Sequence, residues 1–438
     1  MSLQWPSKRL ADVADIRVSN VDKKTSDSER PVKLCNYMDV YSNEYVDSRL
    51  DFMAGSATSA EIDRFGLNCG DVIITKDSET PDDIGIAAVI AEAIENLVCG
   101  YHLALIRPEA SELDSVYLAK QLSTSRVSRY FALNASGSTR YALSISAIES
   151  VSIPMPPKPE QTMIAKILST VDRAIEQTEA SIAKQERIRT GLMQDLLTCG
   201  VDEHGNIRSE ATHAFKDSTL GRIPIEWDVE SLGNVIGSIK SGWSPTCEAE
   251  PSSEGEWAIL KTTAVVWPGY AQGENKRLPA NLRGDPSIEV KQDDILITRK
   301  GPVERVGVVV HVGETRSLLM IPDTVFKVRV SDHSQVVPSF LPLTLGSASV
   351  QSDWFQKKIG LADAQVNLNH SILRTTEFAK PNPEEQLRIV SEIKRCSSQA
   401  TSDLNQLAKI RRLKSALMQD LLTGKKRVTP LLKPQLSC

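Results

Sequence analysis

The sequence repeats itself at an offset of about 225 residues, and this repeat restricts the chain to folds with two related halves. The seven residues LMQDLLT occupy positions 192–198 and return without change at 417–423. A proline-rich stretch ending in Glu-Gln precedes them in both halves, at 156–161 and at 381–386. Since 438 residues also exceed what one ordinary core accommodates, we expect two domains of one architecture.

The regions upstream of these stretches match in pattern as well. Each half begins with a tryptophan followed by spaced aliphatic residues, namely Trp5, Leu10 and Val13 in the first half and Trp227, Leu232 and Val235 in the second. Further on, an aliphatic run ending in a cation, at 70–76 and at 293–299, is followed by a second aliphatic run at 84–90 or 306–312. This pattern predicts paired strands around a loop. Because the loops differ strongly, one scaffold is expected to carry two loop sets.

The segments after each Glu-Gln are predicted to be long helices. Pro159 or Pro383 begins each helix and Gly200 or Gly424 follows its end. The predicted length is about 38 residues, or ~57 Å at 1.5 Å per residue. Apolar positions alternate in steps of four and three, with polar interruptions, as in a coiled-coil seam. The seam positions are Ile164, Leu168, Val171, Ile175, Thr178, Ile182, Gln185, Arg189, Leu192 and Leu196, and then Ile389, Ile393, Cys396, Ala400, Asp403, Leu407, Ile410, Lys414, Leu417 and Leu421. A mutual helix pair explains this shared spacing better than two helices that each pack only on their own domain.

The composition is that of a globular protein, 41% hydrophobic and 24% charged. No segment approaches the ~20 apolar residues of a membrane span, and the start lacks the pattern of a signal peptide, so we expect a soluble cytoplasmic protein without membrane contacts. The seven cysteines lack a Cys-x-x-Cys pair, which argues against a disulfide framework and a zinc site. The net charge of -5 is unusual for a nucleic-acid binder, unless cations gather on one face or partners neutralise the phosphates.

Catalytic motifs are missing from the sequence. There is no phosphate-binding loop of the GxxxxGK[ST] type, no glycine-rich S-adenosylmethionine loop and no amino-methyltransferase motif. Asp82 and Asp323 each follow a proline, but neither precedes the acidic-x-lysine pair that a metal-dependent nuclease needs. The histidines show neither metal-ligand spacing nor an adjacent nucleophile motif; they are His102, His204, His213, His311, His333 and His370. We therefore expect a chain without catalytic residues, bound cofactor or metal.

Taken together, these motifs closely resemble the specificity subunits of type I restriction-modification systems. The resemblance rests on the two Glu-Gln stretches, the two LMQDLLT stretches with Gly200 and Gly424, and the linker 201–210 that leads to LGRIPxxW at 220–227. It covers nearly the whole chain, in the order reading domain, helix, reading domain, helix.

The resemblance implies a function and partners. Each variable domain is expected to read one half of a split, asymmetric double-stranded DNA target, and the helices to set the gap between the halves. The partners implied are two modification subunits, which carry methyl transfer, and two restriction subunits, which carry the translocase and nuclease. S-adenosylmethionine, ATP and magnesium are expected only on those partners.

The expected fold is α+β, with two mixed α/β target recognition domains in a pseudo-two-fold arrangement, separated by two long antiparallel coiled-coil helices. The expected boundaries are 1–157 for the first recognition domain, 158–199 for the first spacer helix, 200–226 for a linker, 227–382 for the second recognition domain, 383–424 for the second spacer helix and 425–438 for a C-terminal tail.

Candidate DNA contacts fall first on the variable loops. A cation that ends a strand at a divergent loop can reach a base edge while the scaffold contacts the backbone. The candidates are Lys76, Arg299, Lys300 and Arg305, for which solvated loop charges are the alternative interpretation. Asp77, Glu79, Asp82 and Asp83 make the first loop acidic, so it suits a cytosine amino group better than a phosphate, or is simply solvated.

A second candidate patch precedes each helix, at 138–141 and 365–370. Amide side chains suit adenine, and an arginine suits guanine or phosphate. The candidates here are Arg140, Tyr141, Gln365, Asn367 and Asn369. A basic cluster in the second helix, Lys409, Arg411, Arg412 and Lys414, followed by 425–427, is interpreted as a solvated face or a partner contact.

Two other classes of protein remain open at this point. A coiled-coil adaptor that does not read DNA would leave the divergent loop sets unexplained. A methyltransferase or nuclease in its own right would need the cofactor motifs that are missing.

Overall fold

The computed structural model describes residues 5–267, 269–360 and 365–432. It divides into two compact units. The first comprises Met1–Ala180 and Leu404–Cys438, and the second comprises Ser181–Asp403. Each unit therefore contains one domain built of sheets and short helices, together with one part of each long helix.

The first domain is built on a five-stranded sheet in the order β2-β10-β6-β8-β4 and a three-stranded sheet in the order β5-β3-β9. The strands of the larger sheet are β2 (Ala14–Val18), β10 (Leu103–Pro108), β6 (Val72–Thr75), β8 (Ala87–Ile90) and β4 (Tyr45–Val46), and those of the smaller are β5 (Met53–Ala57), β3 (Arg30–Cys35) and β9 (Leu97–Cys99). Side chains of β6 alternate between two cores, with Val72 and Ile74 in one and Ile73 in the other. Both faces of the larger sheet are therefore covered.

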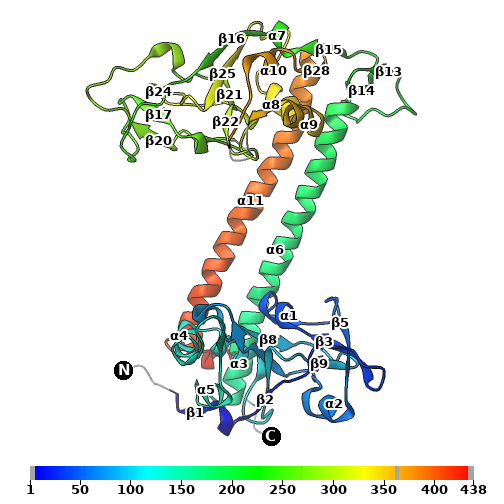
Figure 1. Cartoon of the computed structure of the whole chain (residues 1–438), viewed down its shortest axis with the longest axis vertical. Coiled ribbons are helices and arrows are strands. Elements are labelled where there is room, and N and C mark those ends of the chain that lie inside the picture. Colours follow the sequence, from blue (N-terminus) through cyan, green and yellow to red (C-terminus); the bar gives the residue numbers. More distant parts are fainter. Residues whose placement is uncertain (1–4, 268, 361–364, 433–438) are drawn as a thin grey trace. The chain divides into compact units, whose positions relative to one another are not determined.

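Helices cover one of these faces. The helices are α3 (Ser115–Leu122), α4 (Ser125–Asn134) and α5 (Ile145–Glu149), and they share a core with the beginning of α6. On the other side of the domain lie α1 (Tyr37–Tyr41) and α2 (Ser59–Phe65). The pair β1 (Ser7–Arg9) and β12 (Ser152–Pro154) joins the two ends of the domain. Figure 1 shows this domain in blue and cyan beside the first part of α6.

The second domain repeats this topology. Its larger sheet has the order β16-β25-β21-β23 and its smaller one the order β20-β17-β24, in which β17 and β24 are parallel just as β3 and β9 are. The bounds are β16 (Ile236–Ser241), β25 (Val325–Val330), β21 (Ile295–Thr298), β23 (Val309–His311), β20 (Asn275–Arg277), β17 (Ala258–Leu260), β24 (Leu319–Met320), α8 (Leu341–Leu345), α9 (Ala348–Lys357) and α10 (His370–Arg374). The pair β15 (Asp228–Ser231) and β28 (Glu377–Lys380) closes this domain as β1 and β12 close the first. The α+β repeat predicted from the sequence is confirmed.

The two predicted long helices are present as α6 (Lys158–Thr198, 41 residues) and α11 (Pro383–Leu422, 40 residues). In the first unit, Arg411 of α11 contacts Glu179 of α6 at 2.6 Å. Lys414, one turn later in α11, contacts Asp172, two turns earlier in α6, at 2.8 Å. The pairing is therefore antiparallel there.

In the second unit the remaining parts of the two helices also pack together. Leu196 of α6 lies in one core with Ile389 and Ile393 of α11. The amide of Gln185 donates to Asp403 at 2.8 Å, so two polar seam positions bond to each other. The predicted seam is thus confirmed in both units.

The Glu-Gln residues at each helix start have separate roles. Glu385 is fully buried and accepts from the Trp227 indole (3.1 Å), from the Val201 amide (2.9 Å) and from Arg208. The neighbouring Gln386 accepts from the backbone of Val337 at 2.8 Å. Glutamate therefore ties the start of α11 to the segment that follows α6, while glutamine ties it to its own domain.

The first unit contains the counterpart. Arg427 donates to both oxygens of buried Glu160, at 2.7 and 2.6 Å, and Gln161 accepts from the backbone of Asp114 at 2.9 Å. We name the pairs Arg208–Glu385 and Arg427–Glu160 the helix-start clasps. Arg427 is thus an internal ion-pair partner and not the solvated or partner-facing cation expected from the sequence.

Two segments expected to be a linker and a tail are more ordered than that description implies. Residues 200–226 contain a hairpin of β13 (Phe215–Ser218) and β14 (Gly221–Pro224), and the side chain of Arg208 is only 8% exposed. After α11, Val428 is buried. Gly200 and Gly424 start these segments with φ of +68° and +72°, where a side chain would be strained.

Candidate nucleic-acid interface

The end of β6 in the first domain is held by a buried hydroxyl. Thr75 accepts from the backbone N–H of Ile86 at 3.0 Å. The next residue, Lys76, donates its N–H to His102 (3.0 Å), and its carbonyl accepts from Leu143 (2.8 Å). The chain then forms β7 (Asp77–Ser78), which pairs with β11 (Tyr141–Ala142). The two patches predicted separately from the sequence therefore lie side by side. We name Lys76 together with the paired strands β7 and β11 the first edge ladder.

The second domain builds the same arrangement. Thr298 accepts from Val308 at 2.9 Å, and Arg299 donates to Thr324 and accepts from Leu368, both at 2.8 Å. The following strand, β22 (Lys300–Gly301), pairs with β27 (Val366–Asn367), so that Lys300 lies opposite Asn367; β26 (Ile359–Gly360) adds a third strand. We name Arg299 together with the strands β22, β27 and β26 the second edge ladder. It places the predicted loop and the predicted amide patch side by side.

Side chains of the first edge ladder largely neutralise one another. Lys76 contacts Asp77 at 2.8 Å, and the same carboxylate oxygen contacts His102 at 2.8 Å. The Lys76 side chain is only 16% exposed, so its charge is already compensated within the domain. Arg140 is exposed and Tyr141 half-buried. Arg140 is therefore the more accessible cation of this ladder.

Two tyrosines beside the first ladder were missed by the sequence analysis. Tyr37 and Tyr41 of α1 stack with their ring centroids 5.3 Å apart. The neighbouring Asp83 carboxylate of the variable loop raises the pKa of Tyr41. The spacing of four residues was the signal in the sequence, because residues four apart lie on the same face of a helix and can contact each other.

The second edge ladder carries more free positive charge. The Arg299 guanidinium lies 4.6 Å from the ring centroid of Phe326 and donates to the Ser241 hydroxyl at 3.0 Å. Phe326 packs edge-on against His370, whose pKa is lowered by burial and then by the charges of Arg299 and Arg374. Neutral His370 therefore does not compete with Arg299 for an anion at pH 7.

The other candidates of the second domain differ in exposure. Lys300, Arg305 and Gln365 are exposed, and within the residues that the structure describes neither cation forms an ion pair. Asn367 is half-buried in β27. Trp243, which the sequence analysis did not single out, is 38% exposed two residues after Ser241. The sequence analysis predicted no strand before Trp243, so no signal in the sequence marked this residue.

Asn369 has a structural role, because its side chain caps α10 by accepting from the N–H of Ile372 at 2.9 Å. Ser144 caps α5 in the same way, accepting from Ala147 at 3.2 Å. We expect Asn369→Ala to lower the free energy of unfolding by about 1 kcal/mol, measured by urea denaturation, and Asn369→Ser to restore most of it. An Asn369→Ala protein as stable as the wild type would contradict this role.

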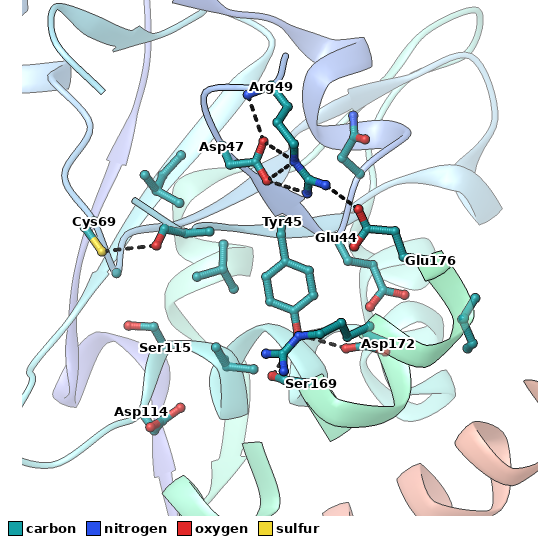
Figure 2. A pocket seen from close by; sticks show the side chains of 18 of the residues that line it. Glu44, Tyr45, Asp47, Arg49, Cys69, Asp114, Ser115, Ser169, Asp172 and Glu176 are labelled. Atoms are coloured by element: carbon teal, nitrogen blue, oxygen red, sulfur yellow. Dashed lines mark hydrogen bonds and ion pairs between the residues drawn. The ribbon is translucent and has the colours of Figure 1, made fainter. Parts of the chain in front are cut away.

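A cleft of about 740 Å³ lies in the first unit, between the first domain and the adjoining parts of α6 and α11. Figure 2 shows Tyr45 pointing across it toward Ser169 and Asp172, and the Tyr45 hydroxyl donates to Asp172 at 2.8 Å. Burial raises the pKa of Tyr45 far above its usual value, so the hydroxyl stays protonated. The cleft is lined by ion pairs and hydrogen bonds.

Nothing in the described residues resembles a metal centre or a membrane span. Over residues 5–267, 269–360 and 365–432, no three or more His, Cys, Asp or Glu side chains are grouped so that they could hold a metal ion. Among the helices within those ranges, none is both long and apolar enough to cross a bilayer.

The two domains share one topology, and each carries an edge ladder of the same backbone geometry but with different side chains. Residues 3–186 match the family model described as the type I restriction modification DNA specificity domain. The match covers the first domain and most of α6, so it makes this part of the chain similar to that family.

Curated proteins with similar sequences are also specificity subunits by name. The chain is 39% identical over 174 residues to the EcoEI specificity subunit of Escherichia coli, a match that covers 39% of this chain but only 29% of that protein. It is 25% identical over 309 residues to the putative MjaX specificity subunit of Methanocaldococcus jannaschii, covering 69% of this chain and 68% of that one.

Solved structures share the fold. A specificity subunit from M. genitalium superposes with a TM-score of 0.59 at 14% identity, covering 95% of this chain and 96% of the other. A chain from a study of type I restriction-modification complex assembly gives a TM-score of 0.53 at 15% identity, covering 97% and 99%. At these identities the likeness is one of architecture.

Proposed function

We propose that this chain is the DNA-binding specificity subunit of a type I restriction-modification complex. Each domain reads one half of a bipartite, asymmetric sequence in double-stranded DNA. The observation that carries the proposal is the pair of edge ladders: one backbone arrangement presents Lys76, Asp77 and Ala142 in one domain and Arg299, Lys300 and Asn367 in the other. Two equal scaffolds with unequal side chains are what two unequal half-sites require.

Their chemistry suits the major groove. Arginine and lysine donate to the N7 and O6 atoms of guanine, amide side chains suit adenine, and carboxylates accept from the cytosine amino group. The second ladder offers the cations and amides, and the first loop offers carboxylates. With a net charge of -5, the chain depends on partner subunits for a large share of the phosphate contacts.

The proposal takes the partners and the division of labour from the resemblance to type I specificity subunits. Two modification subunits provide methyl transfer and two restriction subunits provide translocation and cleavage, with S-adenosylmethionine, ATP and magnesium bound there. This chain contributes no catalytic residue and acts in the cytoplasm. The helices α6 and α11 set the number of base pairs between the half-sites.

Single-molecule methylation sequencing tests the proposal. DNA from a host that expresses this chain with its modification subunit is compared with DNA from a host that lacks only this chain. We expect a split, asymmetric methylated motif that disappears on deletion. Identical methylation in both hosts, with assembly of the complex demonstrated, would contradict the proposal and favour a coiled-coil adaptor.

A further inference from the structure

Four charged side chains in the first unit form a closed ring of alternating sign. Lys120 contacts Asp172 at 2.6 Å, and Lys414 contacts the other oxygen of Asp172 at 2.8 Å. The Glu44 carboxylate contacts both lysines and completes the ring. We name these residues the four-charge ring. Figure 2 shows Glu44 and Asp172 on the wall of the cleft, with Tyr45 between their two elements.

The ring joins three parts of the unit. Glu44 directly precedes β4 and Lys120 lies in α3, so both belong to the first domain, whereas Asp172 lies in α6 and Lys414 in α11. One pair lies within the domain, Glu44–Lys120, and one within the helix pair, Asp172–Lys414. The other two pairs, Lys120–Asp172 and Glu44–Lys414, cross from the domain to the helices. Each helix is therefore held by a charge of its own.

Most of the ring is shielded from water. The side chains of Lys120, Asp172 and Lys414 are 5%, 9% and 17% exposed, and only Glu44, at 51%, faces solvent. Burial raises the pKa of Asp172, but the charges of Lys120 and Lys414 outweigh burial and lower it, so this carboxylate stays ionised at neutral pH. Charges in such surroundings add little net stability, yet displacing one from its partner is costly. A ring of this kind therefore selects one placement of the domain on the helices.

A neighbouring pair is less suited to that role. Arg49 and Glu176 also connect the domain to α6, but their side chains are 69% and 56% exposed. Solvent and salt screen exposed pairs, which contribute little to orientation. The mostly buried ring is therefore the contact that can orient the first domain on the two helices.

The described part of the second domain, residues 227–267, 269–360 and 365–382, forms no equivalent ring. By the offsets of the repeat, Lys120, Asp172 and Lys414 correspond to Leu343, Ser397 and Arg189. Leu343 packs against the apolar core of the second unit, and the Ser397 hydroxyl donates to a carbonyl of its own helix. The internal repeat alone therefore does not require the ring, which among the described residues occurs in the first unit.

We propose that the four-charge ring orients the first recognition domain on its helix pair and thereby restricts the number of base pairs accepted between the two half-sites. Its members are positioning residues and do not contact DNA. This inference rests on the proposed function of the chain.

A charge exchange in two steps tests the ring. The double variant Glu44→Lys/Lys120→Glu preserves the attraction within the domain and within the helix pair, but makes both crossing pairs repulsive. Adding Asp172→Lys/Lys414→Glu makes all four pairs attractive again with reversed signs. The exposed pair Glu392–Arg395, exchanged within α11, is the matched control.

The readout is methylation of a DNA library in which the two half-sites of the wild-type motif are separated by spacers of different length. Complexes assembled with modification subunits are compared. For the double variant we expect the preference for the wild-type spacer over spacers one base pair longer or shorter to fall about tenfold, as a loss of ~1.4 kcal/mol of discrimination gives, with the half-site bases unchanged. The quadruple variant recovers the preference, and the control keeps it.

Folding is separated from orientation by a neutral variant, Glu44→Gln/Lys120→Met/Asp172→Asn/Lys414→Met, which removes the ring without leaving an unpaired charge. It is expected to keep its melting temperature and to lose spacer preference. A lower methylation level with an unchanged spacer preference in this variant would overturn the inference. If the wild-type complex itself shows no bipartite motif, the proposed function fails instead, so the two failures are distinguishable.

Discussion

Replacing Arg299, Lys300 and Arg305 together with glutamine is expected to lower the affinity of the assembled complex for its methylated motif by about 100-fold or more. A bidentate base contact contributes roughly 1–3 kcal/mol of discrimination between bases. Each lost phosphate contact reduces the salt slope, the slope of log affinity against log salt concentration, by about 1. Fluorescence anisotropy with labelled DNA at several salt concentrations measures both quantities. An unchanged slope with lost sequence preference assigns the three cations to bases, and a reduced slope assigns them to phosphates.

Lys76→Gln is the matched control, because Lys76 occupies the position of Arg299 in the first edge ladder but is already paired with Asp77. We expect a much smaller change in affinity from this substitution. The melting temperature of each variant shows whether the loss of the Arg299 contact with Phe326 affects folding. A triple variant that binds the motif as tightly as the wild type would exclude the second ladder from the interface.

Replacing Arg208 with methionine is expected to destabilise the second unit by about 3–5 kcal/mol, because a buried carboxylate loses its charge partner. Glu385 is fully buried, and the Trp227 indole and the Val201 amide cannot neutralise it. Urea denaturation followed by tryptophan fluorescence reports this change, since Trp227 is buried at the clasp. A double variant Arg208→Met/Glu385→Gln removes the charge and is expected to recover part of the loss.

Arg222 provides the comparison for Arg208. Its side chain is 50% exposed and contacts Glu210 and Asp217 at the surface of the same unit. Surface ion pairs contribute little to folding stability, so Arg222→Met is expected to leave the urea concentration at the unfolding midpoint unchanged. Equal effects of the two substitutions would contradict the role assigned to the helix-start clasp.

Much of the architecture was predictable from the sequence because its signals are local. The spacing of apolar residues predicted α6 and α11, and glycines in the left-handed region mark their ends, at Gly200 and Gly424. The repeat predicted two domains of one topology, and aliphatic runs ending at Lys76 and Arg299 marked the strand ends that became the edge ladders. Periodicity, turn chemistry and repetition act over a few residues or at a constant offset, so they can be read along the chain.

The remaining features depend on pairings between distant residues. Arg208 and Glu385 are 177 positions apart, and Lys414 and Glu44 are 370 apart. Nothing beside Arg208 or Arg427 in the sequence distinguishes a clasp from a solvated cation. The contact of His102 with the Asp77 carboxylate, which also pairs with Lys76, joins residues 25 positions apart. The sequence determined which segments become helices, strands and variable loops, because local geometry and burial depend on neighbouring residues. Only the tertiary structure decided which charges are paired inside the protein and which remain exposed, because charge compensation depends on distance in space.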